Sequence, residues 1–593
     1  MKQILKVTSE KGDDSVVLSR HNRTMLRSCF FLAAFALGAF PALAQSPQRA
    51  FLEQFQSSRI LFPSETSGIL ADSPGRYPEP LNFILESVLS WAPQGEPKLM
   101  SPACSSDLWQ ERMQDPRIKN SPQLQGALVQ KYFQECRTEL ETGNNGYFAN
   151  LKGMMTMKYA PQTHPFLRRV LISLPGNVKL KGLLGLKGDF KRRPMVVIRL
   201  GIFSNVEDFK PERAWLMMLF EQSPFNVLLL ENMSSSDFVA NNNQFSFGGY
   251  DEGIQNILVA RLLNDPVEPI SQVVDSVHFF GISLGGHGLL FASLLNKYNS
   301  PKHGPLIKSF TALCPVVDLK STMMSLTQSG VKSAFVDLWS RQRLAGLDRK
   351  IPSLVVYDNF AFLAKAISEI TRTYHGGLSY ISSIKLPPGM KDSNDFWGVN
   401  DFWKFYNDVE EPVLVLATEQ DPAVPFALNS ERLQNRDIKY DSKNIRVVDL
   451  PQGVHCTLPI PYDWHSLTGL FQSYILSHSP NFRMTSRSLE MELSDEEWTT
   501  FLDKGSRVHF EVQDPPKKSG FVTLALEVEN TKGDDKSMNL SLPLSQFDFR
   551  FLNPELSVSE QEMIVRWLYQ NLHVRIIQKD GKFVLRTSWP VAL

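Results

Sequence analysis

The chain has 593 residues, and at roughly 100 to 200 residues per domain this length suggests three or four domains. Aliphatic, aromatic and sulfur residues make up 42% and charged residues 21% of the sequence, which excludes a disulfide-stapled miniprotein and a globally disordered chain. Lys plus Arg and Asp plus Glu both number 62. This balance offers no basic excess for phosphates or an anionic membrane surface, so we expect no nucleic-acid partner.

Residues 1–44 have the pattern of a secretory signal peptide. Scattered Lys and Arg residues precede an almost wholly apolar stretch from Phe30, which ends in Ala42-Leu43-Ala44. This pattern predicts cleavage after Ala44. An uncleaved anchor is the alternative, but the apolar stretch is shorter than the ~20 residues of a spanning helix. Translation from Met25 would leave a conventional short signal. We expect an exported, periplasmic or extracellular protein with no transmembrane segment in the mature chain.

Four cysteines follow this segment: Cys104, Cys136, Cys314 and Cys456. An oxidising compartment permits disulfides, and Cys104 and Cys136 share one helical segment, so we predict that they are joined. Cys314 lies in an apolar run, where a small buried thiol is expected. The sequence contains neither a CxxC pair nor an HExxH motif, so it supports no zinc site and we predict no metal.

The chain changes character at about residue 166. Residues 45–165 favour helices and loops, with 123–140 the clearest amphipathic segment, and give no strand signal. We therefore predict an N-terminal helical extension. Segments 167–174 and 178–186 then flank Pro175-Gly176-Asn177, which predicts a β-hairpin.

Apolar runs without alternation follow the hairpin, and strands buried on both faces have this composition. They cover residues 195–200, 225–230, 277–280, 307–317, 412–417 and 445–450. Helical patterns such as 250–263 separate several of these runs. Strands that alternate with helices predict an α/β domain at 166–480 with a mostly parallel sheet and helices on both faces.

The runs that end at residue 317 and begin at 412 lie too far apart for a single crossover helix. We predict an inserted helical cap at about 320–411. Aromatic residues crowd the end of the insertion: Phe396, Trp397, Phe402, Trp403, Phe405 and Tyr406. Large aromatics usually pack in a core, and the alternative is that one or two of them line an apolar cleft.

A separate, smaller α+β domain is expected at 481–593. Strand-like runs at 508–512 and 521–528 lie between two helix starts. Two capping boxes mark these starts: Ser494 with Glu497, and Ser557 with Glu560.

The sequence Gly281-Ile282-Ser283-Leu284-Gly285 directly follows the predicted strand 277–280 and precedes a helical run at 286–295. In such a strand-turn-helix context the serine is held in a strained conformation that exposes its hydroxyl, and a Cβ at either glycine would collide with neighbouring elements. We interpret Ser283 as a nucleophile. The alternative is a glycine-rich turn that only packs closely.

A serine nucleophile needs a base, and the base needs an acid to orient it. Asp421 follows the predicted strand 412–417, and His455 follows the strand 445–450. Parallel strands present their C-terminal ends at one edge of a sheet. Asp421, His455 and Ser283 are therefore expected to meet there.

Other residues compete for the two roles. Asp318 follows the run ending at 317 and is the main alternative acid, with Glu419 a minor one. His287 lies one helical turn after Ser283, where capping or packing is the expected role, and His465 falls inside a predicted helix at 462–478.

The order of Ser283, Asp421 and His455 along the chain resembles that of the α/β-hydrolases, over about residues 166–478. The resemblance implies a nucleophile at Ser283, a general base at His455 and an orienting acid at Asp421. The helix 462–478 is similar to the last helix of the family. The long gap between Ser283 and Asp421 is explained by the insertion.

The same resemblance implies an oxyanion hole made of two backbone N–H groups. Leu284, the residue after the nucleophile, provides the first. The family often has a His-Gly pair after the strand at 195–200, whereas this chain has Leu200-Gly201-Ile202. The glycine is kept and the histidine is missing. Because the donor is a main-chain group, we expect Ile202 to provide it.

These features predict an exported serine hydrolase, similar to carboxylesterases and lipases, that cleaves an ester through an acyl-enzyme on Ser283. The substrate would be a small-molecule or lipid-like ester, and no cofactor is required. The inserted cap at about 320–411 is expected to cover Ser283 and to form the acyl pocket. A serine peptidase of the same fold is the nearest alternative, although the residues before 166 lack the repeated short strands of a propeller. The second alternative is a binding protein on a degenerate hydrolase fold. The intact order of Ser283, Asp421 and His455 argues against that alternative.

Overall fold

The computed structural model describes residues 51–62, 100–150, 167–328, 336–341, 362–373, 383–390, 395–440, 444–543 and 568–592, with short gaps inside these ranges. The chain divides into two units, Met1–Ala50 and Phe51–Leu593. The expected signal peptide and the capping box at Ser557 lie outside the described residues. None of the helices in the described ranges is both long and apolar enough to span a bilayer.

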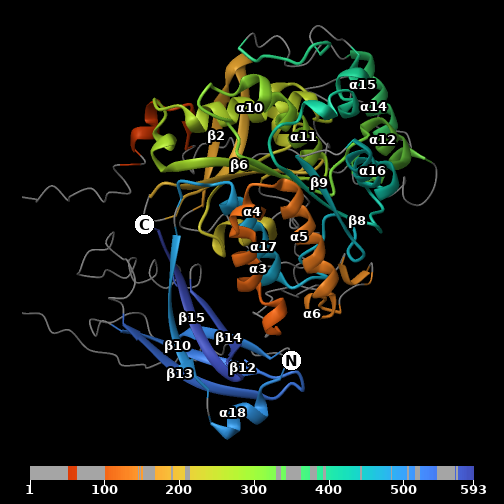
Figure 1. Ribbon diagram of the computed structural model, residues 1–593. Coiled ribbons are helices and arrows are strands. Elements are labelled where there is room, and N and C mark those ends of the chain that lie inside the picture. Colours follow the sequence, from red (N-terminus) through yellow and green to blue (C-terminus); the bar gives the residue numbers. More distant parts are fainter. Residues whose placement is uncertain are drawn as a thin grey trace, which may run out of the picture. The chain divides into compact units, whose positions relative to one another are not determined.

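A mostly parallel sheet forms the centre of the second unit (Figure 1). Its strands in spatial order are β1 (Ile60–Leu61), β2 (Leu167–Leu174), β3 (Val178–Gly185), β5 (Asn226–Leu230), β4 (Arg193–Arg199), β6 (Val274–Ile282), β7 (Ser309–Leu313), β8 (Val413–Thr418) and β9 (Ile445–Leu450). Neighbours are antiparallel from β1 to β5 and parallel from β5 to β9. The predicted α/β class and the predicted hairpin of β2 and β3 are confirmed.

The strands are apolar throughout because both faces of the sheet are buried. Alternate residues of β4 enter two different cores: Met195 and Val197 pack on one side, and Val196 and Ile198 on the other. Side chains along a strand point to opposite faces in turn. An uninterrupted apolar run is therefore what a doubly covered strand requires.

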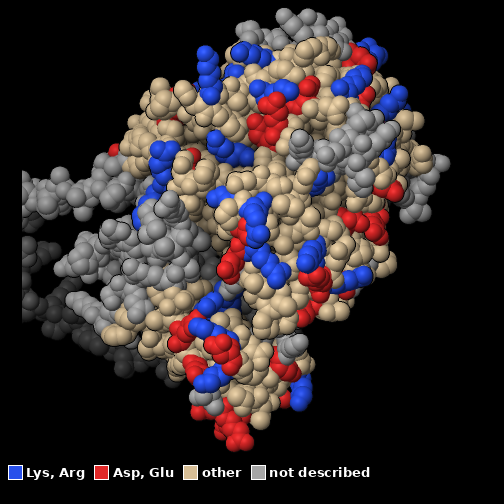
Figure 2. Space-filling view, viewed as in Figure 1, with Lys and Arg blue, Asp and Glu red and all other residues tan. Residues whose placement is uncertain are grey.

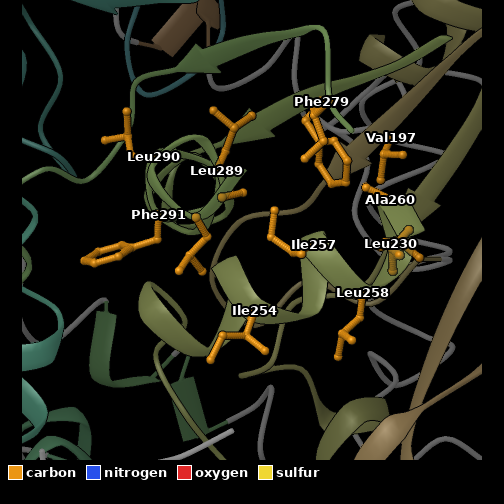
Figure 3. Packing of buried hydrophobic residues seen from close by; sticks show 14 of the residues in the cluster. Val197, Leu230, Ile254, Ile257, Leu258, Ala260, Phe279, Leu289, Leu290 and Phe291 are labelled. Carbon is orange, nitrogen blue, oxygen red and sulfur yellow. The ribbon is translucent and has the colours of Figure 1, made fainter. Parts of the chain in front are cut away.

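Two long helices cover the first face, α10 (Tyr250–Asn264) and α11 (Leu284–Asn299). Figure 3 shows Ile254 and Ile257 of α10 beside Leu289 of α11, in one cluster with Phe279 of β6. Gly253 brings the two helices close, since a Cβ there would lie 2.7 Å from Phe291 Cβ. The short helix α9 (Ser236–Asn242) contributes Phe238 and Val239 to the same core.

The second face is covered by α17 (Trp464–Ser477) and by helices of the N-terminal extension. The helices of the extension are α3 (Ser106–Gln114), α4 (Pro116–Lys119), α5 (Pro122–Glu135) and α6 (Arg137–Leu140). On α5, Gly126 approaches β9 so closely that a Cβ would lie 2.6 Å from Arg446 Cβ, and the Gln125 Nε2 group donates to Ser477 Oγ over 2.7 Å. The extension therefore completes the core on this face of the central sheet.

Two details of the extension differ from the sequence prediction. Strand β1 pairs with β2 although no strand was expected there, because a two-residue strand is too short to show alternation. The amphipathic segment 123–140 is broken between α5 and α6, where Cys136 leaves the helical conformation at φ −105° and ψ 13°.

The insertion is helical where it is described, as predicted. It contains α12 (Leu319–Thr327), α14 (Phe362–Thr373) and α15 (Phe396–Val399), and the helix α16 (Ser430–Tyr440) follows β8. Four of its aromatics are buried in the first core, which confirms the packing interpretation for them: Phe396, Phe402, Phe405 and Tyr406. Trp397 and Trp403 are only partly buried against that core.

The C-terminal region contains two separate antiparallel sheets. Their strands are β10 (Met484–Glu492), β15 (Lys582–Ala592) and β14 (His573–Lys579) in one, and β11 (Arg507–Val512), β12 (Phe521–Glu529) and β13 (Asp535–Pro543) in the other. Helix α18 (Glu496–Phe501) begins after an N-cap at Asp495, one residue later than the predicted Ser494. The expected α+β class is confirmed for this region.

Surface charge follows the balance of the sequence. On the face shown in Figure 2, Lys and Arg are interspersed with Asp and Glu rather than gathered by sign. Buried ion pairs also occur, such as Lys181 with Asp237, joined over 2.8 Å.

Cys104 and Cys136 form a disulfide, as predicted. Replacing both residues with Ala should lower the free energy of unfolding by about 3 to 4 kcal/mol, because the bond closes a loop with a sequence separation of 32 residues. Thermal unfolding with and without reductant measures this. Reductant should lower the midpoint of the unmodified protein and leave the double variant unchanged. Equal sensitivity of both proteins would contradict the prediction.

Candidate active site

Ser283 occupies a strained turn between β6 and α11. Its φ of 56° and ψ of −118° lie outside the helical and extended regions. Ser283 N donates to Leu313 O on β7 over 2.9 Å, which ties the turn to the neighbouring strand. A Cβ at Gly281 would lie 2.7 Å from Gly285 O, and one at Gly285 would collide with Arg199 O and Leu200 O. Both glycines are therefore required by the close approach of the backbone.

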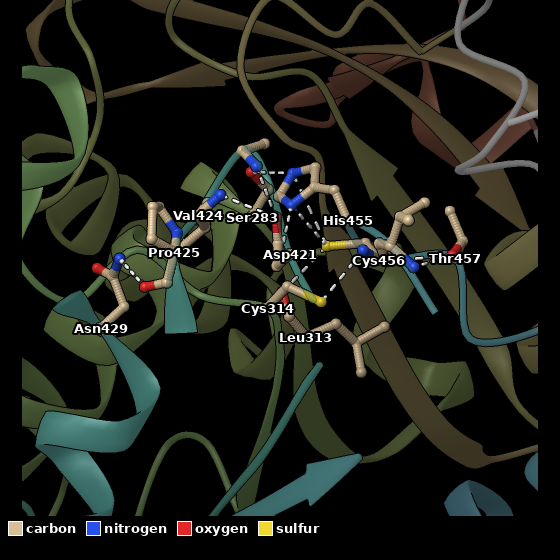
Figure 4. Close-up of polar contacts among 12 residues, drawn as sticks. Ser283, Leu313, Cys314, Asp421, Val424, Pro425, Asn429, His455, Cys456 and Thr457 are labelled. Carbon is tan, nitrogen blue, oxygen red and sulfur yellow. Dashed lines mark hydrogen bonds and ion pairs between the residues drawn. The ribbon is translucent and has the colours of Figure 1, made fainter. Parts of the chain in front are cut away.

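His455 and Asp421 lie beside this serine (Figure 4). His455 Nε2 is 2.8 Å from Ser283 Oγ, and His455 Nδ1 is 2.8 Å from Asp421 Oδ2. The three side chains come from the ends of β6, β8 and β9. The structure thus brings together the three residues that the sequence singled out.

The surroundings of Asp421 fix the direction of the hydrogen-bond chain. Its Oδ1 accepts the backbone N–H groups of Ala423 and Val424, over 2.8 and 2.9 Å. Its Oδ2 accepts from His455 Nδ1, because an ionised carboxylate can only accept. The neutral imidazole then presents an unprotonated Nε2 to Ser283 Oγ. The Asp421 side chain is 2% exposed and that of His455 28%, so the base is open to solvent while its acid is not.

The competing residues have other roles. Asp318 caps α12 by accepting from Ser321 N over 2.9 Å, and it pairs with Arg432. His287 Nδ1 donates to Val316 O over 2.9 Å, and burial lowers the pKa of His287 to about 4. Both residues are therefore committed to local structure. Glu419 is exposed, and His465 lies within α17.

The residue before the expected donor Ile202 lies close to the nucleophile. A Cβ at Gly201 would sit 3.3 Å from Ser283 Cβ and 3.8 Å from Ser283 Oγ. Leu284 opens α11, and the first N–H groups of a helix have no partner within it. Among the described residues, no hydrogen bond occupies the Ile202 N–H group.

The N-terminal extension also contacts the loop that carries His455. Thr142 N donates to Pro461 O over 2.9 Å, and Thr457 Oγ1 donates to Asn150 Oδ1 over 2.7 Å. Thr457 Oγ1 in turn accepts from Val454 N over 3.0 Å, next to the histidine. These contacts were not predicted, since their partners lie some three hundred positions apart in the chain and neither segment carries a motif.

Cys314 and Cys456, which lie outside the disulfide, are close to the base. Cys456 N donates to Cys314 Sγ over 3.1 Å, and Cys456 Sγ lies 3.9 Å from His455 Nδ1. Both thiols are buried, as expected for Cys314. Among the described residues, no cluster of His, Cys, Asp and Glu is arranged to hold a metal ion.

A buried charged pair lies under the site and was also missed by the sequence reasoning. Arg199, at the end of β4, and Glu252, on α10, are fully buried, and Arg199 Nε is 3.3 Å from Glu252 Oε1. Burial raises the pKa of Glu252 to about 7, and the charge of Arg199 acts in the opposite direction. A charged residue at the end of an apolar strand was the signal that could have pointed to this pair.

The strand order, the serine turn after β6, and the acid and histidine after β8 and β9 together define the α/β-hydrolase fold. No family model matches the chain, and a search of curated proteins finds no match.

A search of solved structures finds distant similarities. Dipeptidyl peptidase 4 of Porphyromonas gingivalis matches with 12% identity over 51% of this chain and 33% of its own, at a TM-score of 0.30. A puromycin-hydrolyzing peptidase of Mycobacterium tuberculosis matches with 13% identity over 52% and 38%, at 0.32. An esterase of Pyrococcus furiosus matches with 16% identity over 53% and 95%, at 0.33. The matched part of this chain thus spans only about a third of the length of each of the two peptidases.

Proposed function

We propose that the protein is an exported serine hydrolase that cleaves a carboxylic ester through an acyl-enzyme on Ser283. The observation that carries the proposal is the continuous chain from Ser283 Oγ through His455 to Asp421, with both hydrogen bonds at 2.8 Å. A strained, glycine-flanked serine at the start of a helix supports it, because such a turn places the hydroxyl where a carbonyl carbon can approach. Export is proposed from the pattern of residues 1–44 alone.

The geometry supports a two-step mechanism. Ser283 Oγ attacks the ester carbonyl carbon while His455 Nε2 takes the hydroxyl proton. The negative charge on the former carbonyl oxygen would be stabilised by the N–H groups of Leu284 and Ile202. Collapse of this intermediate breaks the bond to the leaving alcohol, whose oxygen receives the proton from His455. Water then attacks the acyl-enzyme with the same base, which releases the acid and restores Ser283.

Asp421 has a positioning and electrostatic role in this mechanism. It holds the imidazole so that Nε2 faces the serine, and its charge stabilises the imidazolium that forms at each proton transfer. Its two backbone donors, Ala423 and Val424, keep the carboxylate fixed while the histidine changes charge.

The proposed roles predict the effects of four substitutions. Ser283→Ala and His455→Ala should each reduce turnover of an activated ester by about 10³-fold or more, because the members of a triad act as a unit. Asp421→Asn should be somewhat milder. Asp318→Asn is the control, because it removes a half-buried carboxylate at the same sheet edge. The partners of Asp318 are Ser321 and Arg432 and not the histidine. Turnover that falls with Asp318→Asn and survives Asp421→Asn would contradict the assignment of the acid.

Turnover should also depend on pH through His455. Only the neutral imidazole accepts the serine proton, so the rate should fall about tenfold per pH unit once acidification protonates this histidine. Protonation of His287 would not cause this fall in rate at mildly acidic pH, because burial lowers the pKa of His287 to about 4. Steady-state rates measured together with circular dichroism separate inhibition from unfolding. A flat rate over the acid range in folded protein would exclude His455 as the base.

The insertion is proposed to act as a cap that contributes to the acyl pocket. Its two partly buried tryptophans are the candidates, and replacing Trp397 or Trp403 with Ala should change the ratio of short-chain to long-chain ester turnover. Trp498→Ala in the C-terminal domain is a matched control, because Trp498 is also partly buried against a core. Loss of stability with an unchanged chain-length ratio in both cap variants would show that these tryptophans only pack.

A further inference from the structure

The chain that follows β4 at residues 200–203, named here the oxyanion loop, needs an external constraint. It contains Gly201 and Ile202 and ends at Phe203, whose φ of 60° is unusual for an aromatic residue. Such conformations persist only where the surroundings over-determine them. Phe203 is buried and packs on Phe247, with ring centroids 6.3 Å apart.

Asn232, two residues after the end of β5, supplies that constraint on both sides of Ile202. Its Nδ2 group donates to Leu200 O over 3.1 Å, at the start of the oxyanion loop. Its Oδ1 accepts from Ser234 Oγ over 2.6 Å, and Ser234 Oγ accepts from Phe203 N over 2.8 Å, at the end of the loop. One buried amide therefore fixes the residues before and after the proposed Ile202 donor.

The amide is itself anchored to the buried charged pair. Asn232 Nδ2 also donates to Glu252 Oε1 over 2.6 Å, and Met233 N donates to the same oxygen over 3.2 Å. Glu252 is paired with Arg199, the last residue of β4. Asn232, Ser234, Glu252 and Arg199 are fully buried, where hydrogen bonds are not exchanged with water.

We propose that Asn232 is a positioning residue that holds the Ile202 N–H group in place for the oxyanion formed at Ser283, a role that rests on the proposed hydrolase function. An asparagine suits the role because one side chain both donates to Leu200 O and accepts from Ser234. The aspartate isostere could not donate, and it would place a second carboxylate beside Glu252.

The test compares Asn232→Ala with Asn226→Ala. Asn226 is a matched control because it stands at the opposite end of β5, is buried, donates to Val273 O over 3.0 Å and accepts from Lys187 N over 3.0 Å. Both changes remove a bridge between backbone groups, so both should lower the unfolding midpoint. Only Asn232→Ala should reduce kcat for an activated ester, by about 10- to 100-fold with little change in KM, because a displaced donor weakens binding of the transition state alone.

The rate of labelling by a fluorophosphonate should fall in parallel with kcat, since the phosphoryl oxygen occupies the same donors. Ser234→Ala removes the acceptor of Phe203 N and the donor to Asn232 Oδ1, but it leaves the Asn232 contacts with Leu200 and Glu252 in place. This variant provides the test if Asn232→Ala does not fold. Ser234→Thr keeps the hydroxyl and should restore the rate.

Three results would overturn the proposal. Wild-type kcat and labelling rates in Ser234→Ala and Asn232→Ala would show that the network does not position the donor, while the hydrolase function would stand. An equal loss of kcat in Asn226→Ala would show that losing any buried amide near either end of β5 has the same effect. An unmodified protein that neither turns over esters nor is labelled would overturn both this inference and the proposed function.

Discussion

The backbone turn at Ser283 is the constraint on which the rest of the structure depends. A serine with φ 56° cannot continue either β6 or α11, so the turn must be held by its surroundings. Leu313 O on β7 accepts from Ser283 N, and Gly281 and Gly285 allow the neighbouring backbone to approach. A parallel sheet that is covered on both faces provides this rigidity. It also delivers Asp421 and His455 to the same edge, because every parallel strand ends there.

The polar residues under this edge stabilise the arrangement in a different way. Leaving a buried donor or acceptor unpaired is costly, so the Asn232, Ser234 and Glu252 network allows few alternative conformations of the oxyanion loop. The N-terminal extension restrains the loop that carries His455, where Asn150 Oδ1 accepts from Thr457 Oγ1. Nucleophile, base and proposed oxyanion donor are thus each held by a separate part of the chain.

Most of the fold could be predicted because burial leaves a strong pattern. The run 445–450 coincides with β9, and the helical pattern that begins at Tyr250 coincides with the start of α10. The three candidate catalytic residues were found because each follows an apolar strand. The Asn232 network could not be predicted, since an asparagine after a strand resembles any loop residue and Glu252 resembles the exposed face of a helix. Short features such as β1 and the break at Cys136 depend on tertiary contacts that leave no periodicity.

The central claim is that Ser283 is an activated nucleophile, and chemical modification tests it most directly. The purified protein is incubated with a fluorophosphonate, its intact mass is measured, and the modified residue is located by peptide mapping. We expect a single adduct on Ser283 that is absent from Ser283→Ala and from unfolded protein, since only the folded site supplies the base. An unmodified wild-type protein, or an adduct on another residue that persists in Ser283→Ala, would contradict the account.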